Sequence, residues 1–559
     1  MNTIAVTIKG DFIIIKTPGP FAKETIKKVP GAWWKGSPLS HWRLPRSPAA
    51  AGILSESCND DGIKIIVDKK SSEQFYSLVD QYTLRKDVQV HKTAYYLPLP
   101  RLTVKKPWLH QLRGYHFYKD LEAGMIPFDM GTGKSKLAID LMFNNPVQPF
   151  RALIISPRYV VSVWPKQLKI HAPLPYAIAA PGKPLTIDRR IKRLQQEEDL
   201  AIASGKPFFA VINYEAVVNK KMQRYLLKRM WDFIICDESH RFKSPTGKQA
   251  RFIRTQLRRR AYRRFTLSGT PATNTPLDIW SQYYFLDPAI FGTSYTRFRQ
   301  KFCMIDIYGR PYNWLESNEM NRLFYSIAYQ VRAQDVLDLP EKNHVELFCD
   351  FEPEARRVYN DMKSKLIAEV EDGIITAANA AVKLLRLLQI TGGTAPTEGG
   401  EKKRISTAKE ELLGELLEDL GPKEPLVVFA VFHDDLDAIK RIAISKGRTV
   451  GEMSGRTKGD QVQAWTNGEI DVLAAQIKSA SLGVDFTRAR YAAYYCPGYS
   501  AGDYDQSERR LWRPGQNHPV TYFRLMVRNT ADAGAYEAIE GMLDIIEAIL
   551  GVRKGYKDV

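Results

Sequence analysis

One short segment constrains the fold of this 559-residue chain more than any other. Residues 129–135 read Asp-Met-Gly-Thr-Gly-Lys-Ser, follow an apolar run at 125–128, and precede a segment typical of a helix at 136–143. Glycines there let backbone amides curl around an anion, and the helix amino terminus adds a favourable dipole. The segment therefore predicts a phosphate-binding loop between a buried strand and a helix, although Phe128 replaces the first glycine of the general pattern.

An acidic pair is the second constraint. Asp237 and Glu238 end the apolar run at 233–236, so both carboxylates are expected at the carboxyl end of a strand beside the loop. There Lys134 would neutralise phosphate, Ser135 and Asp237 would hold Mg²⁺, and Glu238 would orient or deprotonate an attacking water. An acidic pair alone could equally cap a helix. Its position after a phosphate loop favours the catalytic interpretation.

A pair of arginines lies far downstream, in residues 506–516 (Gln-Ser-Glu-Arg-Arg-Leu-Trp-Arg-Pro-Gly-Gln). Arg510 and Arg513 are three apart, and Gln506 is one turn earlier, so all three share a face if the segment is helical. A planar guanidinium suits the charge of a terminal phosphate. The alternative is a solvated basic helix, which the strict spacing of glutamine, arginines and glycine disfavours.

The charge balance suggests the partner. A net charge of +19 favours a polyanion, most commonly nucleic acid, over a basic surface without a partner. The basic residues form interrupted clusters, for example at 105–106, 258–264 and 402–404, which fit a groove better than a tail. The five cysteines are scattered without a Cys-x-x-Cys pair, which argues for a reducing compartment and against a zinc site or disulfide framework. Without a long apolar run or a leader, no membrane association is expected.

Hydrophobic patterning predicts the domain organisation. Short apolar runs alternate with helical stretches over residues 105–345 and again over 406–559, which indicates an α/β protein with two parallel-sheet lobes. Residues 346–405 are expected to form a helical insertion. Residues 1–100 predict a small α+β domain that begins with a hairpin around Gly10 and Asp11.

As a set, these segments resemble the Swi/Snf-type branch of superfamily-2 helicase-like ATPases. The resemblance covers roughly residues 105–535 and extends to 154–164, 268–271 (Ser-Gly-Thr-Pro), 330–342 and 385–392. It implies two RecA-like lobes with helical insertions, ATP and Mg²⁺ as cofactors, and DNA-stimulated hydrolysis that drives translocation. The compact chain is most similar to bacterial, phage or annealing-helicase members, which implies a cytosolic protein acting on duplex or branched DNA.

The same resemblance extends the set of candidate site residues. The candidates for binding nucleotide are Gln111, at the adenine edge, and Gly131, Thr132, Gly133, Lys134, Ser135, Gly483 and Gln506. The candidates for contacting nucleic acid are Arg158, Ser268 and Thr270. The family's usual Gly-Leu-Asn-Leu is Gly-Val-Asp-Phe at 483–486, so Asp485 replaces an amide.

The amino-terminal domain resembles, weakly, the small accessory modules of annealing helicases. Trp34 and Trp42, with Trp33, could stack on bases or wedge into a DNA junction. Alternatively, they form the core of the small domain, which needs large side chains inside.

The leading hypothesis is an ATP-driven translocase that remodels forks or junctions in replication, recombination or repair. A motor that removes proteins such as RNA polymerase from DNA, and the motor of a restriction or defence system, remain alternatives of the same class. A DNA-binding scaffold without enzymatic activity is disfavoured, because Lys134, the acidic pair and both arginines are intact.

Overall fold

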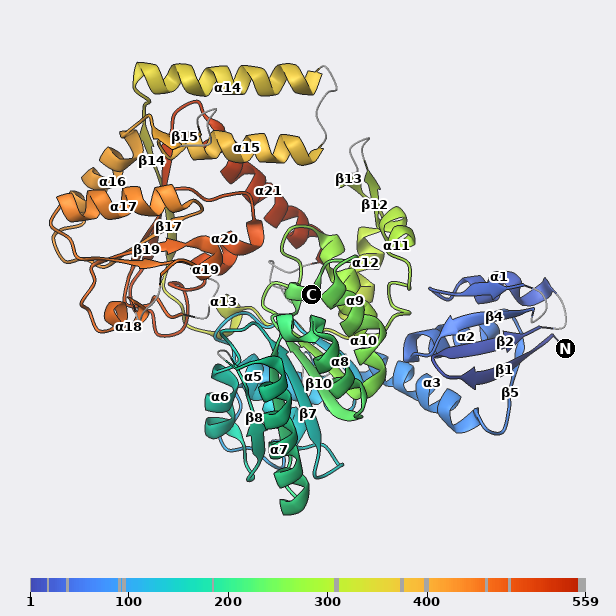
Figure 1. Ribbon diagram of the computed structural model, residues 1–559. Helices are drawn as coiled ribbons and strands as arrows, with labels where there is room; N and C mark the ends of the chain where they lie inside the picture. The colour runs from blue at the N-terminus through green and yellow to red at the C-terminus, as the bar shows by residue number, and fades with distance from the viewer. Residues whose placement is uncertain are drawn as a thin grey trace.

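The computed structural model describes residues 2–17, 20–36, 40–88, 92, 97–182, 185–305, 311–371, 377–396, 402–457, 461–480 and 484–550. A small amino-terminal domain and two larger lobes each contain one main sheet (Figure 1). Every strand pair in the two six-stranded lobe sheets is parallel. The predicted fold class, an α/β protein with two parallel-sheet lobes and a small α+β domain, is confirmed.

The amino-terminal domain has a five-stranded sheet that shares one hydrophobic core with its helices. The strand order is β3 (Trp33–Lys35), β4 (His41–Pro45), β2 (Phe12–Lys16), β1 (Thr3–Lys9) and β5 (Lys64–Val67), and the helices are α1 (Lys23–Lys27), α2 (Pro48–Asp60) and α3 (Ser72–Asp87). The hairpin β1–β2 turns at Gly10, whose φ of +56° favours glycine. Trp42 is 8% exposed and lies in the core, whereas Trp33 and Trp34 are 39% and 47% exposed.

The first lobe continues from helix α4 (Leu109–Tyr118). Its sheet order is β6 (Ala123–Ile126), β11 (Ala261–Leu267), β10 (Trp231–Asp237), β7 (Arg151–Ser156), β9 (Phe208–Asn213) and β8 (Ala177–Ala179). Its further elements are α5 (Lys134–Phe143), α6 (Val163–His171), α7 (Ile187–Ser204), α8 (Lys220–Leu227), α9 (Lys248–Thr255), α10 (Ile279–Leu286), α11 (Tyr295–Phe302), the hairpin β12 (Cys303–Ile305) and β13 (Pro311–Trp314), α12 (Ser317–Tyr325) and α13 (Ala333–Val336). The central strands are continuous apolar runs because both faces of the sheet are covered.

The second lobe repeats this architecture. Its sheet order is β14 (Lys342–Cys349), β21 (Val520–Val527), β20 (Tyr491–Tyr494), β17 (Leu426–Ala430), β19 (Val472–Gln476) and β18 (Val450–Met453). Its further elements are α14 (Pro353–Glu371), α15 (Ala377–Thr391), the hairpin β15 (Thr394–Pro396) and β16 (Lys402–Arg404), α16 (Ala408–Asp419), α17 (His433–Ser445), α18 (Gln461–Thr466), α19 (Ile477–Ala480), α20 (Ala501–Glu508) and α21 (Ala531–Leu550).

The start of the second lobe differs from the expectation. The sequence placed it at residue 406, but β14 already pairs along its whole length with β21. Strand β14 begins with three polar residues and is largely exposed, as suits an edge strand, so it lacks the long apolar run that marks the central strands. The helices α14 and α15 are therefore inserted within the second lobe rather than between the lobes.

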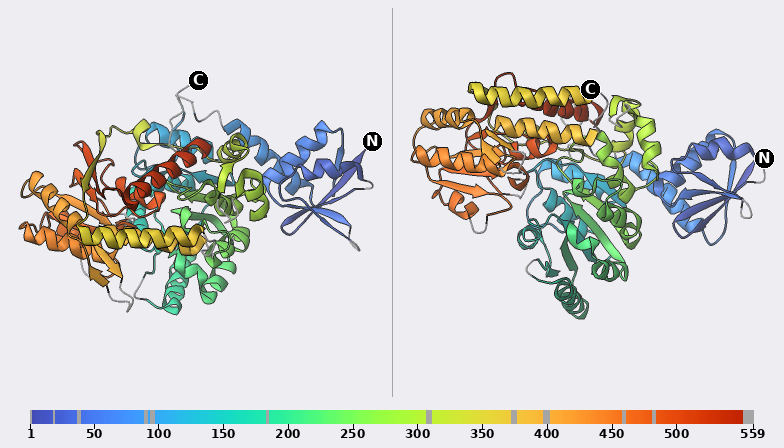
Figure 2. Two further views of the ribbon diagram at one scale, coloured as in Figure 1. Left: turned by 90° about the horizontal axis from the view of Figure 1, so that it is seen from above. Right: turned by 45° about the horizontal axis from the view of Figure 1, so that its top comes forward.

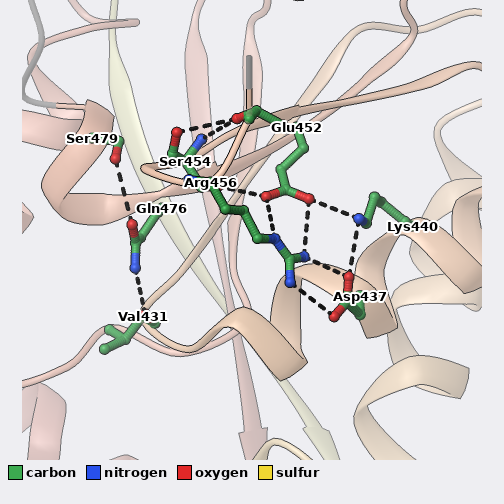
Figure 3. A network of polar contacts seen from close by, with 9 residues as sticks. Val431, Asp437, Lys440, Glu452, Ser454, Arg456, Gln476 and Ser479 are labelled. Atoms are coloured by element: carbon green, nitrogen blue, oxygen red, sulfur yellow. Dashed lines mark hydrogen bonds and ion pairs between the residues drawn. The ribbon is translucent and has the colours of Figure 1, made fainter.

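An ion network holds the edge of the second sheet at the carboxyl end of β18 (Figure 3). Glu452 accepts hydrogen bonds from Lys440 Nζ at 2.7 Å and from Arg456 Nε at 2.8 Å, and Arg456 also pairs with Asp437. Burial alone would raise the pKa of Glu452, but the hydrogen bonds from Arg456, Lys440 and Ser454 lower it to about 2. The carboxylate is therefore ionised at neutral pH and fixes α17 to the segment after β18.

Helix α21 connects the second lobe back to the first (Figures 1 and 2). Its last turn supplies Ile546, Ile549 and Leu550 to a hydrophobic cluster that includes α12 of the first lobe. Tyr325 Oη donates to Leu550 O at 2.7 Å. The two lobes are thus joined at α21 as well as through the chain between α13 and β14.

The amino-terminal domain projects from the side of the first lobe away from the second lobe (Figure 2). Arg85 Nη1 lies 2.7 Å from Asp287 Oδ2, and both side chains are buried. Asp287 also accepts from the backbone amides of Ala49 and Ala289. A charge pair this well enclosed is costly to break by removing one partner. Within the described residues, no helix combines the length and the apolar character needed to cross a bilayer.

The different environments of Trp42 and Trp34 predict different effects on stability. Trp42→Ala should lower the free energy of unfolding by about 3 kcal/mol or more, because it empties a core position. Trp34→Ala should cost about 1 kcal/mol, because only its edge-to-face contact with Trp42 is lost. Urea unfolding of the full chain measures both, and equal losses would contradict the placement of the two side chains.

Candidate active site at the lobe interface

The phosphate loop has the conformation that its glycines allow. Gly131 and Gly133 have φ values of +79° and +87°, and α5 begins directly after them at Lys134. A Cβ at Gly133 would lie 2.0 Å from Gln111 Nε2, and one at Gly131 would lie 2.6 Å from Pro514 Cδ. Glycine is therefore required at both positions for backbone conformation and for space.

Two polar side chains at the start of α4 are within hydrogen-bonding distance of the phosphate loop. Gln111 Nε2 donates to Thr132 O at 3.1 Å, and Gln111 Oε1 accepts from the amide of Trp108. His110 Nε2 lies 2.9 Å from the same Thr132 carbonyl. The amide of Gln111, predicted to contact adenine, thus fixes the loop to the start of α4. Its contact with adenine stays a prediction.

The Lys134 side chain is hydrogen-bonded to backbone carbonyl groups at the start of the loop. Its ammonium group donates to the carbonyl oxygens of Phe128 at 2.8 Å and Asp129 at 3.2 Å. Ser135 follows in the first turn of α5 and is partly exposed. The ammonium group would have to exchange these carbonyl contacts for phosphate oxygens on nucleotide binding.

The acidic pair ends β10, as the sequence predicts. Asp237 Oδ2 accepts from Trp164 Nε1 at 3.0 Å, and Oδ1 accepts from the amide of Glu238. Burial, reinforced by the neighbouring Glu238 carboxylate, raises the pKa of Asp237 to about 7. A buried carboxylate destabilised in this way is suited to a cation, and the hydroxyl of Ser135 is a second oxygen ligand of the kind that Mg²⁺ prefers. These residues fit the predicted metal.

Glu238 has a strained backbone that the surrounding side chains support. Its φ of +48° is unusual for a residue with a Cβ, and such strain is concentrated at functional sites. Glu238 Oε2 lies 3.5 Å from His240 Nδ1, which is also 3.3 Å from Ser268 Oγ. Ser268 Oγ in turn accepts from the amide of Thr270. The carboxylate is thereby linked to the Ser-Gly-Thr-Pro segment at 268–271.

Residues of the second lobe close over this site. Gln506 Nε2 donates to Thr270 Oγ1 at 3.1 Å, and Arg509 Nη1 pairs with Asp129 Oδ2 at 2.5 Å. Asp129 also accepts from the amide of Ala333, at the start of α13. The phosphate loop and segment 268–271 therefore contact segment 506–516 across the lobe interface, and His240 connects Glu238 to segment 268–271.

The two predicted arginines occupy different positions. Arg510 is buried at the interface, where burial lowers its pKa against the opposing influence of Tyr159 and Glu238 of the first lobe. Arg513 Nε lies 3.8 Å from Asp485 Oδ2 within the second lobe. Arg510 is therefore close enough to Glu238 for their charges to interact across the interface.

The remaining candidates vary in position. Arg158 is exposed, whereas Ser268 and Thr270 are buried among the interface contacts, which makes a direct contact with nucleic acid dependent on a rearrangement. Gly483 lies outside the described residues. Trp164, His240 and the pair formed by Asp129 and Arg509 were not predicted. Trp164 and the pair of Asp129 and Arg509 join residues distant in sequence, which no local pattern marks, whereas His240 lies only two residues after Glu238.

Comparisons with known proteins show the family of the chain. Residues 65–391 match the model of the SNF2-related domain, and residues 408–515 match that of the helicase conserved C-terminal domain. A putative protein, p41, of Acyrthosiphon pisum secondary endosymbiont phage 1 is 26% identical over 59% of this chain and 74% of its own length. An uncharacterized ATP-dependent helicase of Mycoplasma pneumoniae is 20% identical over 92% of this chain but only 51% of its own length. The SWI2/SNF2 ATPase core of Sulfolobus solfataricus, solved in complex with dsDNA, aligns over 81% of this chain and 99% of its own, with 19% identity and a TM-score of 0.38.

The loop and the acidic pair generate a first catalytic prediction. Lys134→Ala and Glu238→Gln should both abolish ATP hydrolysis, and Glu238→Gln should retain nucleotide binding because the loop is intact. Phosphate release and binding of a fluorescent nucleotide measure the two properties. Glu215→Gln, which changes an exposed carboxylate on the same lobe, is the matched control and should be fully active. Substantial turnover by either site variant would remove the assignment.

The burial of Arg510 near Glu238 of the first lobe leads to a second catalytic prediction. Arg510→Ala should lower the hydrolysis rate by about 10³-fold, because a cationic group across the interface stabilises charge mainly in the transition state. Arg528→Ala, which removes an exposed arginine from the same lobe, should leave the rate unchanged. If Arg510→Ala hydrolysed ATP normally and lost DNA binding, Arg510 would belong to a nucleic-acid groove instead.

Proposed function

We propose that this chain, which belongs to the SNF2-related family of ATPases, couples ATP hydrolysis to movement along duplex or branched DNA. The observation that carries the proposal is the set of contacts between the phosphate loop and segment 506–516, since they make nucleotide binding and lobe position interdependent. The net charge of +19 and the helicase C-terminal match support DNA as the partner.

Each site residue has a role in the proposed reaction. Lys134 and the loop amides bind the phosphates, and Asp237 with Ser135 holds Mg²⁺, which offsets charge on the phosphate oxygens. Glu238, held by its backbone and by His240, orients the attacking water. Arg510 approaches from the second lobe and stabilises the charge that develops on the transferred phosphate.

Movement follows from the change in interface contacts. Release of phosphate after hydrolysis removes the negative charge that would draw Arg510 toward the first lobe, which weakens the interface at one point. The contacts at Asp129 and Thr270 then limit how far the second lobe can separate. A DNA strand held by both lobes would be displaced by this opening and closing.

The exposed tryptophans of the amino-terminal domain favour branched DNA as the substrate. Trp33 and Trp34 present aromatic surface on β3, where unpaired bases at a junction could stack. Fork regression, branch migration or annealing is therefore the proposed outcome of the motor. ATPase stimulation measured with single-stranded, duplex, forked and four-way DNA tests this directly, and a response no greater to branched than to duplex DNA contradicts it.

A variant of the exposed tryptophan separates the motor from the junction role. Trp34→Ala should keep duplex-stimulated ATPase within about two-fold and lower fork regression by about ten-fold, because base stacking is lost while the phosphate contacts stay. Tyr76→Ala, an exposed aromatic in the same domain, is the control. Full fork activity in Trp34→Ala would refute the role. Deletion of residues 1–100 is a poorer test, because it would leave Asp287 buried without Arg85.

A further inference from the structure

A cavity of about 170 Å³ lies at the seam between the amino-terminal domain and the first lobe. The domain contributes Phe12, Trp33 and Arg46, and the lobe contributes residues of α9, α10 and the turn at 257–260. None of the described lining residues belongs to the phosphate loop or to segment 506–516. The cavity is therefore separate from the nucleotide site.

The lining carries an excess of positive charge. Four arginines but only one carboxylate, Asp11, line the cavity; the arginines are Arg46, Arg254, Arg258 and Arg259. Asp11 Oδ2 is already paired with Arg259 Nε at 2.8 Å. Asp287, the other acidic residue that acts on Arg258, is paired with Arg85. Both carboxylates are thus paired with arginines other than Arg258.

Two of these arginines have donors that the chain does not satisfy. The Nε atoms of Arg254 and Arg258 are buried, and no acceptor in the described part of the chain is within hydrogen-bonding distance. Arg258 Nη2 reaches the carbonyl of Arg46 only at 3.4 Å. Burial and the nearby Arg264 lower the pKa of Arg258 to about 10. Arg254 already donates to Pro245 O at 2.6 Å, so the guanidinium group of Arg258 is the one that an anion in the cavity would supply with a charge-assisted partner.

Aromatic side chains stand beside this charge. Phe12 and Trp33 are in edge-to-face contact, and the guanidinium of Arg43 lies over both rings. Trp33 remains partly exposed at the cavity. Guanidinium groups next to exposed aromatic surface match a nucleotide unit, whose phosphate and base require those two kinds of partner.

We propose that this cavity is a phosphate-binding site that takes one phosphodiester group of a nucleic-acid strand. The strand would then contact the amino-terminal domain and the first lobe at the same time. This would fix the orientation of the amino-terminal domain relative to a DNA junction. Only the identification of the bound strand as DNA rests on the proposed motor function; the phosphate site itself does not. Binding of a phosphate group can be measured without ATP turnover.

The first experiment uses inorganic phosphate and thermal unfolding. It is made in the Lys134→Ala background, so that the phosphate loop contributes as little as possible. Phosphate should raise the unfolding temperature more than chloride at equal ionic strength, because a ligand that binds only the folded state stabilises it. Adding Arg258→Gln should abolish this shift, whereas adding Arg193→Gln, on the exposed face of α7, should keep it.

The second experiment distinguishes a DNA strand from a free anion. Binding of a fluorescent oligonucleotide is measured without nucleotide over a range of salt concentrations. Arg258→Gln and Arg46→Gln should each reduce the slope of log affinity against log salt by about one, as for the loss of one phosphate contact. Arg193→Gln should not change it.

The outcomes separate the possibilities. A phosphate shift that persists in Arg258→Gln, or that is absent from the parent, overturns the site. A phosphate shift lost in Arg258→Gln with an unchanged DNA slope supports a phosphate site but assigns it to a free anion and overturns the strand. Without phosphate, Arg258→Gln should unfold at the parent temperature or above, because it removes a crowded charge. If it fails to fold, Arg258→Lys, which keeps the charge but loses the planar donor geometry, should still weaken the phosphate shift.

Discussion

The contact between the phosphate loop and segment 506–516 is the interaction on which the rest of the structure depends. This contact consists of the ion pair between Arg509 and Asp129 and the packing of Pro514 over Gly131. The hydrogen bond from Gln506 to Thr270 extends it to segment 268–271. Without this contact, the lobes would still be joined at α21, but the residues of the site would be divided between them. With it, the loop, the acidic pair and Arg510 form a single site from distant parts of the chain.

The sequence predicted those parts of the fold that have a local physical signal. Strands β7, β9, β10 and β17 each contain a buried apolar run because both sheet faces are covered, and the loop glycines are marked by the strand and helix beside them. Strand β14 was missed because an exposed edge strand needs no apolar run. The burial of Trp42 and the exposure of Trp34 could not be predicted, since the two are cross-strand partners and differ because β3 is at the edge of the sheet whereas β4 is inside it.

The candidate site likewise contains residues that the sequence predicts and residues that only the structure reveals. Lys134, Asp237 and Arg510 lie in recognisable strings, and the structure brings them to one interface. The residues that position them, such as Trp164 beside Asp237 and Ser268 beside His240, act through contacts that only the fold creates. Arg513 shows the reverse case: its spacing matches that of Arg510, but its nearest acidic partner is in its own lobe.

The central claim is that nucleotide state controls the separation of the lobes, and a distance measurement tests it most directly. Spin labels on cysteines introduced at Lys169 of α6 and Ile444 of α17, both exposed, report the distance between the lobes. Four native cysteines are buried and Cys349 is partly so, which limits unwanted labelling. With a non-hydrolysable ATP analogue the distribution should be short and narrow, and with ADP it should become longer or broader. The same distribution in both states would contradict the account.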